Sequence, residues 1–101
     1  MGLFSRAKPI DLDSLKSEEI DFLISFFENE DGRADAAWAR LGRSGRAVSM
    51  LNKSILSSIR SGYLTKQELD ITLELLDEDS RLHPTDELEY RVKRALWEFV
   101  D

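Results

Sequence analysis

Apolar side chains recur every three or four residues in five stretches of the chain, which is the spacing of amphipathic helices. Short stretches rich in Gly, Pro, Ser, Asn or Asp separate these helices. The pattern therefore predicts an all-α fold, a compact bundle of about five short helices with short connections. The first helix is expected to begin near Ser14 or Ser17 and the others to cover 33–41, 44–60, 65–79 and 85–99.

Several predicted helix ends carry specific signals. Thr65 and Glu68 form a Thr-x-x-Glu capping box, in which each residue satisfies the backbone N–H of the other. Ser44 is expected to cap the third helix and Thr85 the last, because hydroxyl groups accept hydrogen bonds from free amides at helix starts. Gly42 is a typical residue just after a helix end.

Length and composition indicate one domain. The 101 residues are 42% apolar and include no cysteine, which excludes a disulfide scaffold and a cysteine-ligated metal. Residues 1–13 have little periodicity and are predicted to be an N-terminal arm, with a single helical domain over 14–101. No apolar run resembles a signal peptide or a membrane span, so a cytoplasmic location without a membrane partner is expected.

Two segments of the chain align without gaps. Residues 15–28 match 64–77, so that Glu19 meets Glu68, Asp21 meets Asp70, and most apolar positions coincide. This similarity predicts a degenerate two-fold helical repeat. The alternative is that two acidic amphipathic helices resemble each other through composition alone.

Three of the predicted helices carry apolar residues on a second side. A surface helix in a monomer needs one apolar stripe, so a two-sided helix is either central in the bundle or covered by another chain. We therefore predict a homodimer or protein-partner interface, with ordinary core packing as the alternative. The side chains expected at the interface are Phe22, Phe26, Tyr90 and Trp97.

The sequence shows no arrangement typical of catalysis. His83 is the only histidine, so a nucleophile–histidine system of the Ser-His-Asp or Cys-His type has almost nothing to work with. The acidic run that begins at Asp77 lacks the glycine and the final glutamate of a calcium-binding loop. We predict no catalytic, cofactor-binding or metal-binding residues and a protein that is not an enzyme.

The net charge of −6 hides an uneven distribution along the chain. Residues 11–35 contain nine acids and two bases, and residues 68–89 contain nine acids and one base. Between them, residues 36–67 contain six bases and no acid. The middle of the chain is thus a basic segment between acidic flanks.

Residues 41–51, Leu-Gly-Arg-Ser-Gly-Arg-Ala-Val-Ser-Met-Leu, resemble the turn and the recognition-helix start of helix-turn-helix proteins, particularly Myb-like domains. The resemblance extends from Ser17 to Leu51 and implies a three-helix DNA-binding unit whose third helix enters the major groove. The chain departs from that family at Trp38, where a small residue is usual, and at Leu15, where the family has tryptophan. If the third helix enters the groove, its apolar stripe faces inward, and the polar side chains on its outer face and in the turn before it are expected to contact DNA. These side chains are Arg43, Arg46, Ser49, Lys53 and Arg60.

These observations predict a non-enzymatic helical module that binds itself or a protein partner through its exposed aromatic faces. One alternative is a helix-turn-helix DNA-binding regulator that uses the basic helix 44–60. Another is an acidic inhibitor or immunity protein whose surface occupies the basic site of a nuclease.

Overall fold

A computed structural model describes residues 8–100 and confirms the predicted all-α bundle of five helices. A two-stranded sheet accompanies the helices within these residues. The elements are β1 (Ile10–Asp11), α1 (Ser17–Glu28), α2 (Arg33–Arg40), α3 (Arg46–Arg60), β2 (Tyr63–Leu64), α4 (Lys66–Leu82) and α5 (Glu87–Trp97).

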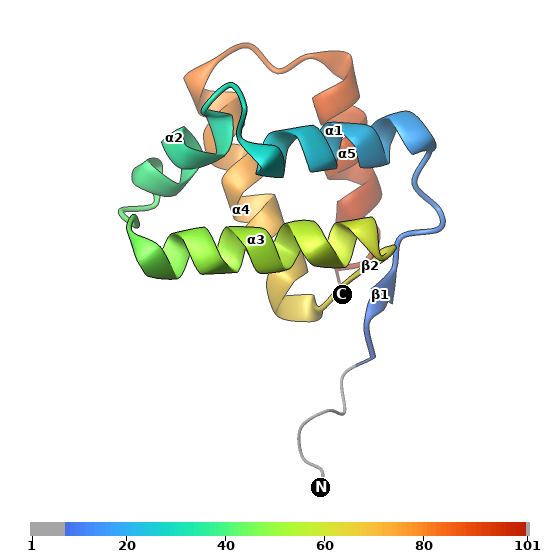
Figure 1. Cartoon of the computed structure of the whole chain (residues 1–101). Coiled ribbons are helices and arrows are strands. Elements are labelled where there is room, and N and C mark those ends of the chain that lie inside the picture. Colours follow the sequence, from blue (N-terminus) through green and yellow to red (C-terminus); the bar gives the residue numbers. More distant parts are fainter. Residues whose placement is uncertain (1–7, 101) are drawn as a thin grey trace, which may run out of the picture.

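The helices form two crossed pairs (Figure 1). Helices α1 and α3 run in opposite directions side by side, and α4 and α5 lie behind them and cross them. The short α2 packs against α4 at one end of the bundle, while α5 packs against α1 and α4. Helix α1 also packs against α2, so α1 and α4 both contact α2 and α5.

The predicted N-terminal arm is too long. Ile10 pairs with Leu64 in an antiparallel ladder, and the side chain of Leu12 is buried in the core. Residues 10–12 therefore belong to the folded domain, because two short segments that look irregular in sequence hydrogen-bond to each other. The remaining part of the predicted arm, residues 1–7, lies outside the described residues.

The capping box at the start of α4 is confirmed. The Thr65 hydroxyl accepts a hydrogen bond from the Glu68 backbone N–H at 3.1 Å, and the Glu68 carboxylate accepts one from the Thr65 N–H at 3.0 Å. The other oxygen of Glu68 accepts hydrogen bonds from the hydroxyls of Ser54 and Ser58 on α3. One glutamate therefore both caps α4 and attaches it to α3.

Two predicted caps are wrong by one residue. Helix α3 is preceded by Gly45 rather than capped by Ser44, and Gly45 has a φ of 96°, which disfavours residues with a Cβ. The cap of α5 is Asp86 rather than Thr85, and the Asp86 carboxylate accepts a hydrogen bond from the Glu89 N–H at 2.8 Å. Helix α4 also continues past the predicted end, to Leu82.

The two segments of the predicted repeat have similar local structure. Glu19 accepts a hydrogen bond from the Lys16 N–H at 2.9 Å, as Glu68 does from Thr65 at the start of α4. Both glutamates are buried, and so are the leucines that precede the two helices, Leu15 and Leu64. The likeness therefore includes a capping contact and a burial pattern as well as composition.

Candidate functional site

Three large aromatic side chains are exposed within residues 8–100, and two of them, Tyr90 and Trp97, lie on the outer face of α5. The third is Tyr63. Tyr90 and Trp97 are 54% and 51% exposed and lie seven residues apart, two turns along the same face. Between them, the Arg94 guanidinium lies 5.9 Å from the centre of the Tyr90 ring. We call this row of three exposed side chains, Tyr90, Arg94 and Trp97, the α5 stripe.

The other two aromatic residues of the predicted interface lie elsewhere. Phe26 is 3% exposed and packs edge-on against Phe27 in the core, so its assignment to an interface is wrong. Phe22 is half-buried beneath the Arg33 guanidinium, 5.6 Å from its ring centre. Helix α1 has two apolar sides because it packs against both α3 and α5, a tertiary arrangement that accounts for its second face without another chain.

The predicted DNA-contacting residues are all exposed, on α3 and the turn before it. Their surroundings differ. Arg43 stacks over the Trp38 ring at 5.3 Å, and Arg60 forms an ion pair with Glu28 of α1. Within residues 8–100, Arg46 and Lys53 form no ion pair, so they are the cations that this face leaves free for a ligand.

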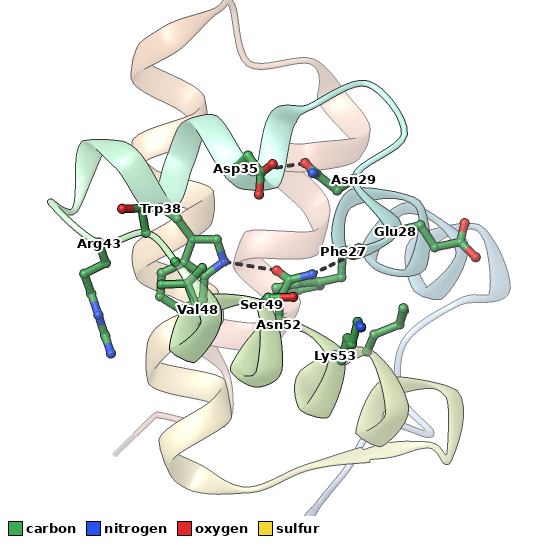
Figure 2. Close-up of a pocket in the computed structure, with 13 residues that line it drawn as sticks. Phe27, Glu28, Asn29, Asp35, Trp38, Arg43, Val48, Ser49, Asn52 and Lys53 are labelled. Carbon is green, nitrogen blue, oxygen red and sulfur yellow. Dashed lines mark hydrogen bonds between the residues drawn. The ribbon is translucent and has the colours of Figure 1, made fainter.

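A groove of about 700 Å³ lies between the end of α1, α2 and the first half of α3 (Figure 2). Beneath it, the Trp38 indole N–H donates to Asn52 Oδ1 at 3.0 Å, and Asn52 Nδ2 donates to the Phe27 carbonyl at 2.7 Å. The groove has side chains of both charges. The charged side chains that line it are Glu28, Asp35, Arg43 and Lys53.

The groove contains no buried polar group that lacks a partner. Among the described residues, such side-chain atoms belong to Thr72, Glu89 and Arg91, none of which lines the groove. The amide of Asn52 already uses both of its ends within the protein. Asn52 therefore ties α1, α2 and α3 together beneath the groove.

A cluster of charged side chains with two buried acids lies where α2, α4 and α5 meet. Arg33 Nε donates to Asp79 Oδ1 at 3.1 Å, and Arg33 Nη2 forms an ion pair with the other oxygen of Asp79. His83 Nε2 lies 2.8 Å from Asp79 Oδ1. Glu89 lies beside them, with Oε1 3.6 Å from Arg33 Nη2, and both Asp79 and Glu89 are fully buried.

The two acids of this cluster are driven to opposite protonation states. Burial alone would raise the pKa of Asp79. Hydrogen bonds to its carboxylate from Arg33, from the protonated Glu89 and from His83 outweigh burial and hold that pKa well below its usual range. Burial and the neighbouring Asp79 carboxylate raise the pKa of Glu89 to about 8. Near neutral pH, the cluster therefore holds one carboxylate, one neutral carboxyl group and the Arg33 cation.

This cluster is not among the sites predicted from the sequence, although the positions of its two acids indicate burial. Asp79 lies three residues after the buried Leu76, and Glu89 lies three before the buried Val92, so each acid falls on the apolar face of its helix. An acid at a core position indicates a paired or protonated carboxyl group. His83, predicted to be an ordinary turn residue, instead contacts Asp79.

The two carboxyl groups of the cluster are inaccessible to solvent and line neither of the two described pockets. Within residues 8–100, no group of three or more His, Asp or Glu residues is arranged to hold a metal ion, and no helix is long and apolar enough to cross a membrane.

Comparisons of this chain with protein-family models, with curated proteins and with solved structures gave no match.

Proposed function

We propose that this protein is a non-enzymatic interaction module that binds a protein partner through the α5 stripe. The supporting observation is the exposure of Tyr90 and Trp97 on one face of α5, with Arg94 between them. Tyrosine, arginine and tryptophan are the residue types that contribute most often to binding energy at protein interfaces. In an isolated monomer, two exposed rings of this size lose the free energy that their burial would provide.

Charge favours a basic partner over a second copy of the chain. Each copy carries a net charge of −6, so self-association would bring two acidic molecules together. Next to the stripe, α5 also exposes Glu87, and Glu98 follows at its end. A partner with an apolar recess for the rings, an acceptor opposite Arg94, and lysine or arginine opposite Glu87 and Glu98 would complement this face. This chemistry includes the basic site of a nuclease, as in the inhibitor alternative.

Replacing both rings, Tyr90→Ala with Trp97→Ala, is expected to weaken partner binding at least about 30-fold, since hot-spot residues contribute about 2 kcal/mol or more. Because both side chains are half exposed, the free energy of unfolding should change little. The assay captures partners with the immobilised protein and then measures the dissociation constant for the purified partner by fluorescence anisotropy.

Met50→Ala provides the matched control. Met50 is 65% exposed on α3, so this variant also removes a large exposed apolar side chain, but from another helix. The proposal requires a partner that the native protein and the Met50 variant retain and the double variant loses. Equal retention by all three proteins would exclude the stripe as the interface, and a dimer in light scattering that the double variant abolishes would replace the basic partner with a second copy.

DNA binding is the second candidate function, and the free cations Arg46 and Lys53 on α3 favour it. If it holds, affinity for duplex DNA should fall about 100-fold between about 50 and 200 mM salt, as for about four phosphate contacts. Arg46→Glu with Lys53→Glu should then abolish binding without loss of helicity. Glu28 lies on the same side and pairs with Arg60, which opposes this function. Absence of binding at low salt would eliminate it.

A further inference from the structure

Helix α5 is held against α1 and α4 by a small set of fully buried side chains. Its fully buried residues are Val92, Leu96 and Glu89, and it is joined to α4 by a short connection that includes Pro84. Leu88 and Ala95 are partly buried against the core, and Arg91 and Lys93 pair with acids of α1 and α4. One of the fully buried groups that seat α5 is therefore an acid. Whether that acid carries a charge affects how firmly α5 packs on the bundle, since an ionised carboxylate in a buried site is far costlier than a neutral one.

Each element around Glu89 contributes to its charge environment. Helix α2 contributes Arg33, whose guanidinium faces both acids, and Asp31 precedes that helix. Helix α4 contributes Asp79, with His83 just after it, and Asp86 lies at the start of α5 itself. The Arg33 guanidinium already binds both oxygens of Asp79, so an ionised Glu89 would have no cation of its own to pair with.

We propose that Glu89 is a proton-dependent latch that holds α5 against α4 and α2. With a proton on Glu89, the buried site contains the balanced pair of Arg33 and Asp79 together with a neutral acid. Without it, two buried carboxylates share one guanidinium, and neither Glu89 oxygen has a hydrogen-bond partner among residues 8–100. Movement of α5 away from α4 relieves this repulsion, because it exposes Glu89 to water.

The direction of the pH effect follows from proton linkage. Burial and the adjacent Asp79 raise the pKa of Glu89 from 4.5 to about 8 when α5 is seated. When α5 opens, Glu89 is solvated and its pKa returns to the ordinary value. Opening therefore releases one proton between these two values, so that the opening equilibrium constant rises about tenfold per pH unit in this window and levels off above it.

The latch also controls the α5 stripe. Tyr90 follows Glu89 directly in the chain, so a shift of α5 moves the aromatic rings relative to α1 and α4. A partner that recognises the stripe on seated α5 should bind more weakly as the pH rises through this window. This last consequence rests on the proposed interaction function, whereas the latch itself does not.

The test is amide hydrogen exchange of the full chain at several pH values from about 5.5 to 9, corrected for the intrinsic pH dependence of exchange. Opening of α5 should increase about 100-fold between about pH 5.5 and 7.5, and amides of α4 should remain better protected. Glu89→Gln, which replaces the protonated acid with a neutral side chain of the same shape, should remove this increase. Glu87→Gln, the same change at an exposed position of α5, should leave it intact.

Two outcomes would overturn the latch. One is α5 protection in the native chain that does not change with pH after correction, a result that needs no variant. The other is an equal response of α4 and α5, which would mean that the whole domain opens rather than α5 alone. Neither outcome concerns the stripe as an interface, which is tested by the ring variants at constant pH.

Discussion

Arg33→Ala is expected to lower the free energy of unfolding by about 3–5 kcal/mol at neutral pH. The substitution removes the guanidinium that donates to Asp79 and faces Glu89, and leaves two buried acids without their cation. It also removes the cation that covers the Phe22 ring. Urea unfolding followed by circular dichroism would measure the loss.

The matched control for this prediction is Arg40→Ala. Arg40 lies on the same helix and pairs with Glu78 at 3.3 Å, but its side chain is half exposed. The loss for an exposed pair of this kind should be about 0.5 kcal/mol or less. Adding Asp79→Asn to the Arg33 variant removes the uncompensated carboxylate and should recover part of the stability. If both arginine variants cost the same, the buried cluster does not contribute as described.

Trp38→Ala is expected to cost about 3–5 kcal/mol, because a large buried side chain leaves a cavity when it is truncated. This indole is 1% exposed and fills the space between α2 and α3. Trp38→Phe keeps an aromatic ring but loses the N–H that donates to Asn52 Oδ1. A buried acceptor left without its donor costs about 1–3 kcal/mol, and the part-buried Asn52 should cost about 1 kcal/mol, at the low end of this range. The phenylalanine variant should therefore lie between the native protein and the alanine variant. Equilibrium unfolding of the three proteins under identical conditions would give these differences.

The hydrogen bond itself can be separated from packing by a double-mutant cycle with Asn52→Ala. Trp38→Phe and Asn52→Ala should together cost at least about 0.5 kcal/mol less than the sum of their separate effects, since both remove the same contact. Additive effects would show that the indole acts through its volume alone and that the Asn52 bridge contributes nothing through it.

The helices could be predicted because their information is local. The spacing of Val92 and Leu96 gives the buried face of α5, and Thr65 with Glu68 gives the start of α4 from two side chains one turn apart. The exact residue that caps a helix is harder to predict than the helix itself. Adjacent residues such as Thr85 and Asp86 both cap well, and the path of the preceding chain decides between them.

What covers each face of a helix depends on contacts between segments that are far apart in the chain. The local sequence pattern does not specify these contacts. The pattern of α1 shows a second apolar side but not that Phe26 packs into the core instead of against another chain. The pairing of Arg33 with Asp79 joins residues far apart in the chain, which composition alone assigns to solvated surface. Exposure of Tyr90 and Trp97 was predicted correctly, whereas their role as an interface remains a prediction.

The pairing of Ile10 with Leu64 has a consequence for the order of folding. These residues are more than fifty positions apart, so their ladder closes a long loop at an entropic cost that grows with its length. Two backbone-paired residues on each side return little free energy by themselves. The ladder should therefore form late, after α1 and α3 have packed together and brought its two strands close. During folding, β1 should therefore pair with β2 only after the helices have assembled, so that this strand contributes to the stability of the native state more than to the rate of folding.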